Sequence, residues 1–91
     1  MSRAFVKEDD HEREPEYRLP PPDSPYYDEA AAWALIQGAD EGDSRGAERA
    51  TGYRWGDAEL VPWIEKILRQ AERDGEDRVA QLARRFLRAA R

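Results

Sequence analysis

Apolar residues recur with a helical period through the second half of the chain, and this pattern predicts helices. The clearest stripe, with spacings of 0, 3, 4, 7, 8 and 11, consists of Val79, Leu82, Ala83, Phe86, Leu87 and Ala90. Positions three and four apart share one face of an α-helix, so this stretch should bury one side. A helix before it carries Leu60, Ile64, Ile67, Leu68 and Ala71, with Trp63 at the edge of the stripe. We predict that it begins at Asp57 or at Pro62, and that Asp74-Gly75 ends it.

An earlier run, Ala30–Ile36, is apolar on nearly every side of a helix. A helix of that kind is central and is covered by neighbours on more than one face. Ser24 followed by Pro25 offers a capping hydroxyl and a proline at the first helical position, so we predict that the helix starts there. Gly38 and Gly42 bracket its end.

A shorter helix should follow, capped by Asp43 or Ser44, with the small residues Ala47 and Ala50 turned toward the first helix. The two predicted pairs of helices resemble each other at an offset of 33 residues. At this offset six pairs of identical residues align in the sequence: Leu35 and Leu68, Gln37 and Gln70, Gly42 and Gly75, Arg45 and Arg78, Ala47 and Ala80, and Ala50 and Ala83. An internal repeat and a chance likeness of two helical hairpins both explain these identities.

The N-terminal part has a different composition. Five of the six prolines lie at or before position 25, and the stretch from Lys7 to Glu16 has no apolar residue except Pro15. Such a stretch cannot bury enough surface to offset its loss of conformational entropy. We therefore predict an all-α protein, with a disordered acidic, Pro-rich tail over residues 1–23 and a small four-helix body of two helical hairpins over residues 24–91. The apolar residues that flank the acidic run, Phe5 and Val6 before it and Tyr17 and Leu19 after it, could form a short partner-binding motif, fold back on that body or make no contact.

Charge narrows the classes of partner. The chain has 20 acidic and 15 basic residues, a net charge of −5. Residues 1–23 hold seven acids and four bases (net −3), and residues 24–91 hold thirteen acids and eleven bases (net −2). Neither part is basic, which disfavours general binding to nucleic-acid phosphates. Arginine outnumbers lysine thirteen to two, and this compositional bias is typical of proteins encoded by GC-rich bacterial genomes.

Residues for catalysis are scarce. The chain has one histidine, no cysteine and no Gly-rich phosphate-binding loop, so we predict neither an enzyme nor a cofactor. His11 and the acidic residues around it, Asp9, Asp10, Glu12 and Glu14, could bind a cation weakly. A metal site needs ligands that a rigid scaffold holds in place, so we predict no metal site here. The sequence has no long apolar stretch, and its start turns acidic before any hydrophobic region develops, so we expect a cytoplasmic protein.

Two groups of residues are candidates for contact with a partner. Tyr53 and Arg54 lie between Gly52 and Gly56, and these residue types dominate interface hot spots. Trp55 beside them is better explained as a core residue. On the last helix, Arg84, Arg85 and Arg88 lie outside the apolar stripe. These arginines could form ion pairs with nearby acidic residues on a solvent-exposed face. Alternatively, they could bind an acidic partner protein or a nucleic acid.

The first ten residues, Met1-Ser-Arg-Ala-Phe-Val-Lys-Glu-Asp-Asp10, resemble the leader of some bacterial Gre-type transcription elongation factors. The resemblance implies a docking leader and RNA polymerase as the partner. Apart from the resemblance, Phe5, Val6, Asp9 and Asp10 are candidate contact residues, because apolar residues beside an acidic run can form a short partner-binding motif. Nothing after Ser24 looks like the long coiled coil of that family. Its magnesium-binding acidic residues have no counterpart here.

These observations predict a non-enzymatic bacterial adaptor that binds a protein, with RNA polymerase and transcription as its first candidate setting. One alternative is a structural homodimer in which the first helix pairs through Trp33 and Ile36. Another is weak DNA binding by the Arg-rich C-terminal helix.

Overall fold

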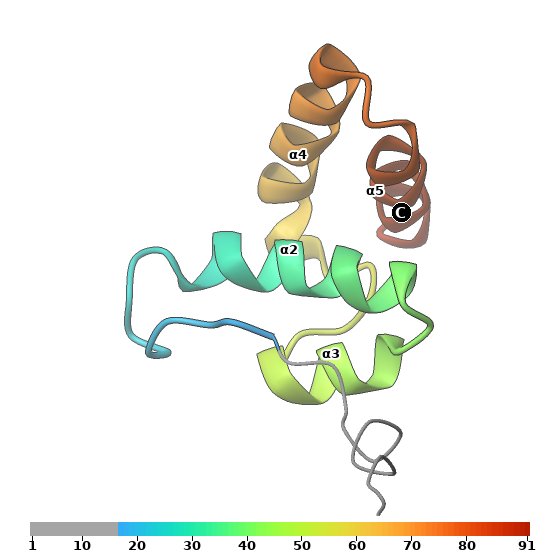
Figure 1. Cartoon of the computed structure of the whole chain (residues 1–91). Helices are drawn as coiled ribbons and strands as arrows, with labels where there is room; N and C mark the ends of the chain where they lie inside the picture. Colours follow the sequence, from blue (N-terminus) through green and yellow to red (C-terminus); the bar gives the residue numbers. More distant parts are fainter. Residues whose placement is uncertain (1–16) are drawn as a thin grey trace, which may run out of the picture.

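The computed structural model describes residues 17–91, and within them it contains four α-helices, one short 3-10 helix and no strand (Figure 1). The elements are α2 (Tyr27–Asp40), α3 (Ser44–Thr51), η1 (Ala58–Leu60), α4 (Val61–Asp74) and α5 (Asp77–Ala89). The predicted all-α fold of two helical hairpins is confirmed: α2 pairs with α3, and α4 pairs with α5. Residues 1–16 lie outside the described residues, so the disorder expected there stays a prediction.

Helix α2 occupies the middle of the molecule. Figure 1 shows α3 along one side of α2, and α4 and α5 on the other. Among the described helices, α3 approaches only α2 closely, whereas α2 also meets α4, α5 and η1. This position explains why the run Ala30–Ile36 is apolar almost all round. Five of its residues and Gly38 are buried: Ala31, Ala32, Ala34, Leu35 and Ile36.

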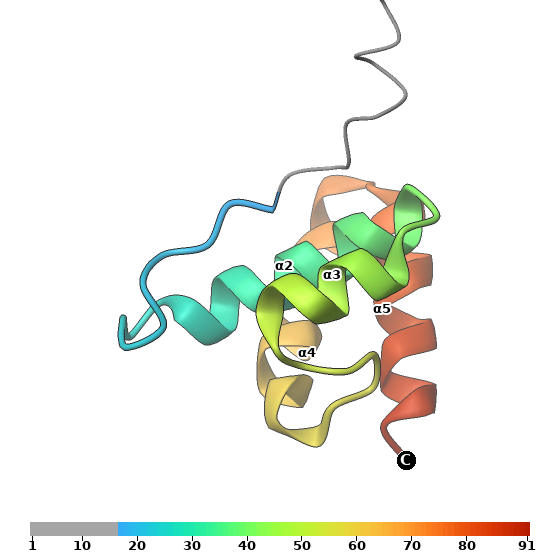
Figure 2. The same ribbon diagram turned by 90° about the horizontal axis from the view of Figure 1, so that it is seen from below.

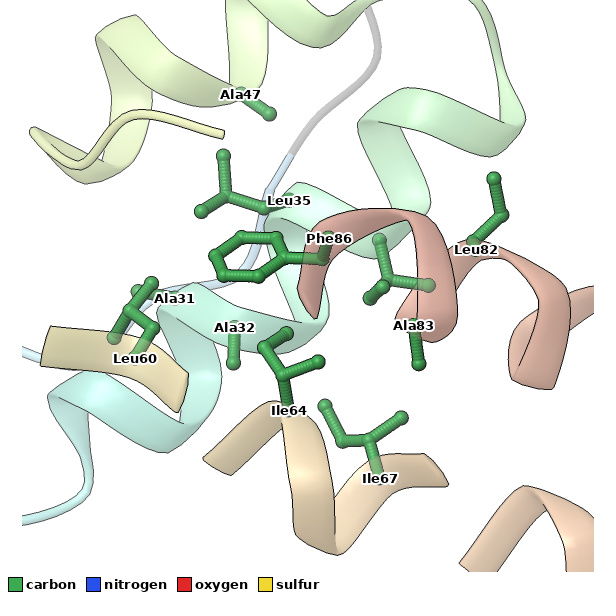
Figure 3. Close-up of a cluster of buried hydrophobic side chains, with 11 residues drawn as sticks. Ala31, Ala32, Leu35, Ala47, Leu60, Ile64, Ile67, Leu82, Ala83 and Phe86 are labelled. Carbon is green, nitrogen blue, oxygen red and sulfur yellow. The ribbon is translucent and has the colours of Figure 1, made fainter. Parts of the chain in front are cut away.

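The core forms where α2, η1, α4 and α5 meet. Phe86 of α5 lies between Leu35 of α2 and Leu60 of η1, with Ile64 of α4 close by (Figure 3). The largest fully buried side chains are Phe86, Leu35, Leu60, Ile64 and Leu82. Burial of one such side chain contributes about 1.5–3 kcal/mol, so this shared cluster accounts for much of the stability of the fold.

The start of α2 differs from the prediction. The helix begins at Tyr27, two residues after Pro25. The hydroxyl of Ser24 accepts the backbone N–H of Tyr26 (3.1 Å), and its carbonyl accepts that of Tyr27 (3.1 Å). Serine here closes a turn that precedes the helix instead of capping the helix itself, a local use of the hydroxyl that competes with capping.

The two hairpin turns have the same geometry at an offset of 33 residues. Gly42 and Gly75 both have left-handed backbones, with φ of 75° and 73°. The next N–H reaches five residues back in each: Asp43 to the carbonyl of Gly38 (2.7 Å), and Glu76 to that of Ala71 (2.8 Å). Such a helix end requires one residue with a left-handed backbone conformation, and glycine adopts this conformation without steric cost. The resemblance between the hairpins therefore extends from sequence to hydrogen bonding.

Two residues assigned above to the tail, Tyr17 and Leu19, are packed against the helices. The hydroxyl of Tyr17 donates to the carboxylate of Asp43 (2.7 Å), and Tyr17 and Leu19 both pack against the core. An aromatic ring and a leucine supply the apolar contacts that the acidic stretch before them lacks, so the packed part of the chain begins no later than Tyr17. This outcome matches the alternative in which the two residues fold back on the body.

The inward face of α3 also differs. Ala47 is fully buried as predicted, but Ala50 is exposed, and Gly46 and Thr51 are buried in its place. The helix is turned so that Ala47 meets Gly38 of α2, where even a Cβ on the glycine would lie only 2.6 Å from the Cβ of Ala47. Within residues 17–91, no helix is long and apolar enough to cross a membrane.

Candidate functional site

The most distinctive surface lies on α3 and the loop that follows it. Six residues line a shallow hollow of about 390 Å³: Arg45, Glu48, Arg49, Gly52, Tyr53 and Arg54. We call this surface the arginine hollow. It brings three guanidinium groups from two turns of helix and a loop to one place.

Helical spacing and one glycine build the hollow. Arg45 and Arg49 are four residues apart, so they lie on the same face of α3. Gly52 ends the helix in a left-handed conformation (φ 80°), which reverses the chain. Tyr53 and Arg54 then return beside the helix that the chain has just left.

Hydrogen bonds attach the returning loop to the helices. The hydroxyl of Tyr53 donates to Asp28 of α2 (2.6 Å), and the backbone N–H of Trp55 donates to Glu48 of α3 (2.8 Å). The hydroxyl of Thr51 donates to the carbonyl of Ala47 (2.8 Å) and accepts the N–H of Tyr53 (3.1 Å). Arg54 is therefore carried by a backbone that is fixed on both sides.

Packing holds the far end of the same loop. The ring of Trp55 meets Phe86 edge to face, with 5.0 Å between ring centroids, as expected for a core residue. Gly56 lies so close to Ala89 that a Cβ on the glycine would be 2.9 Å from that of the alanine. Figure 2 shows the loop running from α3 past α5 to the start of α4.

The three arginines of the hollow form no ion pair with a described carboxylate, and the same holds for Arg18, Arg69, Arg85, Arg88 and Arg91. Among the described residues, Arg73, Arg78, Arg84 and Lys66 pair with carboxylates, as Arg73–Asp74 (3.6 Å), Arg78–Asp40 (2.9 Å), Arg84–Glu72 (2.7 Å) and Lys66–Glu29 (3.5 Å). Three guanidinium groups and the carboxylate of Glu48 give the hollow a formal charge of +2.

Tyr53 serves the hollow as a neutral group. The hydrogen bond to Asp28 raises the pKa of Tyr53 from 10.0 to about 12, with further contributions from burial and from the charges of Asp28, Glu59 and Asp57. The phenol therefore keeps its proton at neutral pH and acts as a hydrogen-bond donor that holds the loop.

The structure brings together only part of the predicted site. Tyr53 and Arg54 line the hollow, whereas Arg84, Arg85 and Arg88 are exposed on α5 and are not part of its lining. Arg84 pairs with Glu72, the solvated-face arrangement considered above, while Arg85 and Arg88 have no ion pair with described residues. Phe5, Val6, Asp9 and Asp10 lie outside the described residues.

Arg45 and Arg49 were not among the residues selected from the sequence. Their spacing of four on a predicted helix was the available signal, since it places both on one face. Gly52 marks the end of the helix in the sequence, but nothing in the local sequence indicates that the loop after it places Arg54 beside Arg45 and Arg49.

A second hollowed surface runs along the outer side of α2. Two hollows, of about 440 and 230 Å³, share Trp33 and Gln37, and the second reaches Val79 and Leu82 of α5. Trp33 is half-buried here and Ile36 is only 3% exposed, because α5 already covers part of this face. The pair proposed for a dimer interface is thus largely used inside one chain. Tyr26, 69% exposed, is the one large hydrophobic side chain that stands out from the described surface.

In residues 17–91, no group of three or more histidine, aspartate and glutamate side chains is placed to hold a metal ion. No protein-family model, curated protein or solved structure matches this chain.

Proposed function

We propose that the chain is a non-enzymatic protein-interaction module that binds an acidic segment of a partner protein through the arginine hollow. The observation that supports this most is the gathering of Arg45, Arg49 and Arg54 around one hollow, where none of them has an ion pair with a described carboxylate. Guanidinium groups bind carboxylates in a bidentate manner, which gives geometric specificity as well as attraction.

A carboxylate-bearing partner suits this surface better than a nucleic acid. Binding to a phosphate backbone requires an extended basic surface, and the net charge of the chain is −5. The hollow is small and has Glu48 in its lining. A few spaced carboxylates would match its three guanidinium groups while avoiding Glu48.

The leader over residues 1–10, which resembles that of Gre-type factors, supports bacterial RNA polymerase as the first partner to test. A cytoplasmic, transcription-linked adaptor would follow from that partner. The arginine hollow would then meet an acidic surface of the polymerase or of a protein bound to it.

Binding of a fluorescein-labelled oligoglutamate peptide to the full-length protein, followed by anisotropy, tests the charge preference. We expect the triple variant Arg45→Gln, Arg49→Gln, Arg54→Gln to bind at least about tenfold more weakly, since each charge-assisted contact contributes about 1.5–3 kcal/mol before solvent screening. The matched control, Arg85→Gln, Arg88→Gln, Arg91→Gln, removes the same charge from another exposed surface.

Equal losses in both triple variants would mean that only net charge matters, and a loss confined to the α5 variant would move the site to α5. Either outcome overturns the proposal. Retention on duplex DNA at low salt that depends on Arg85, Arg88 and Arg91 would instead support the DNA-binding alternative. Sedimentation as a single species of 10.5 kDa would remove the homodimer alternative.

A further inference from the structure

We infer that the acidic segment 7–16 of this same chain binds the arginine hollow, so that the protein covers its own partner-binding surface. The inference rests on the proposed function in one respect: it takes the hollow as a surface for carboxylates. Its consequence is autoinhibition, because an acidic partner must displace the segment before it can bind.

The attachment of Tyr17 determines where the segment begins. The hydroxyl of Tyr17 donates to the carboxylate of Asp43 (2.7 Å) and lies 3.3 Å from the carbonyl oxygen of the same residue. Asp43 immediately precedes α3. The described chain therefore starts beside the helix that carries Arg45 and Arg49, and Figure 1 shows this entry next to α3.

The hollow is within reach of this starting point. An α-helix rises about 1.5 Å per residue, so α3, with eight residues, is about 12 Å long. An extended chain covers about 3.3–3.6 Å per residue, so about four residues before Tyr17 match the length of the helix. Glu14 and Glu16 fall within that distance, and Glu12 lies just beyond it.

Charge favours the contact. The segment 7–16 holds six acids, Glu8, Asp9, Asp10, Glu12, Glu14 and Glu16, against Lys7 and Arg13, a net charge of −4 with His11 neutral. The arginine hollow has a formal charge of +2. A short tether gives an effective concentration of the order of millimolar, so even weak contacts with the hollow compete with a partner in solution.

A spin label near the middle of the segment tests the contact directly. The chain has no cysteine, so His11→Cys provides a single attachment point in the full-length protein. In an isotope-labelled sample, we expect paramagnetic broadening of the amide signals of residues 45–54, well above that of residues 69–76 at the tip of the α4–α5 hairpin. Sodium chloride at about 1 M, where the Debye length is roughly 3 Å, should remove the broadening.

The variant Arg45→Gln, Arg49→Gln, Arg54→Gln in the labelled chain should also remove the broadening, and the α5 variant Arg85→Gln, Arg88→Gln, Arg91→Gln should leave it unchanged. Broadening spread evenly over the surface, or broadening that survives the first triple variant, would overturn the inference. Amide signals of α2 and α5 in the same spectra show whether each variant is folded.

A competition experiment measures the functional consequence. Neutralising Glu12, Glu14 and Glu16 to glutamine should tighten binding of the oligoglutamate peptide by about three- to tenfold, because the hollow is then free in a larger fraction of molecules. Unchanged affinity would contradict autoinhibition. The glutamine variant could bind no peptide while the spin-labelled chain with its natural acidic residues still showed the broadening. In that case the proposed function would fail and the internal contact would stand.

Discussion

At the scale of single residues, the hydroxyl of Tyr53 is the group within residues 17–91 whose ionisation the fold changes most clearly. Its donation to Asp28 (2.6 Å) and the nearby carboxylates of Glu59 and Asp57 make the phenolate unfavourable. A donor to a charged acceptor stabilises more than a neutral pair does. This one bond connects the loop of the arginine hollow to α2.

The raised pKa of Tyr53 predicts a loss of stability in alkali. The ordinary value is 10.0 and the folded value is about 12. Between these values the unfolded chain releases a proton that the folded chain holds, so the free energy of unfolding falls as pH rises. Below pH 10 the contribution is fully present. Urea unfolding at about pH 9 and about pH 11 should show a larger decrease for the natural chain than for Tyr53→Phe. Equal decreases would contradict the assignment.

Gly38 shows how little room separates α2 from α3. A Cβ at this position would lie 2.6 Å from the Cβ of Ala47 and 2.9 Å from the carbonyl oxygen of Asp43. Alanine is the better helix former by about 1 kcal/mol, but the backbone oxygen cannot move without moving the hairpin turn.

We therefore expect Gly38→Ala to lower the free energy of unfolding by about 1–3 kcal/mol, the usual cost of overpacking. Urea unfolding measures this change. The double variant Gly38→Ala with Ala47→Gly should recover part of the loss, since it removes the facing Cβ. No recovery would show that the oxygen of Asp43, not Ala47, is the obstacle.

At the scale of elements, the segment 17–23 behaves as an additional arm of the α2–α3 hairpin. It is held by Tyr17 at the start of α3 and by a turn in which the N–H of Ser24 donates to the carbonyl of Pro21 (2.9 Å).

Tyr17→Phe should detach the start of this arm. The ring is kept and a partly buried hydrogen bond to Asp43 is lost, so we expect the free energy of unfolding to fall by about 1 kcal/mol. Tyr26→Phe is the matched control, since Tyr26 is 69% exposed and its change should stay within about 0.5 kcal/mol. Hydrogen exchange at residues 17–24 should accelerate only in the first variant. Similar exchange in both variants would contradict the role of Tyr17.

The helices show where patterns in the sequence are sufficient. The stripes of α4 and α5 bury the predicted residues Ile64, Ile67, Leu82 and Phe86, because each helix has an inward-facing side, and the predicted Leu60 is buried in η1. The predicted start of α2 and the predicted inward position of Ala50 on α3 were wrong. Both depend on local choices, a turn closed by Ser24 and the rotation of a short helix, that periodicity does not determine.

At the scale of the whole molecule, the two hairpins share one core. Phe86 comes from the second hairpin, yet it packs in a cluster with Ala31, Ala32 and Leu35 of the first (Figure 3). Neither hairpin has a separate core of comparable size within the described residues. The hairpins should therefore unfold as one unit.

Phe86→Ala should lower the free energy of unfolding by about 3–5 kcal/mol, the typical cost of such a truncation. Urea unfolding followed by tryptophan fluorescence and by far-ultraviolet circular dichroism should give coincident transitions in both the natural chain and the variant. Two separate transitions would show that the hairpins are independent. Leu87→Ala, at a half-buried position, is the control and should cost less.

The sequence by itself determined the helical class, the two hairpins with their glycine turns and most of the core stripes, because helical period and glycine conformation act over a few residues. It also indicated Tyr53 and Arg54. Only the tertiary structure decided that Tyr17 attaches the N-terminal arm to α3 and that Arg54 returns beside Arg45 and Arg49. Those contacts join residues whose proximity depends on how the chain reverses and how helices rotate against one another, and no local pattern encodes either.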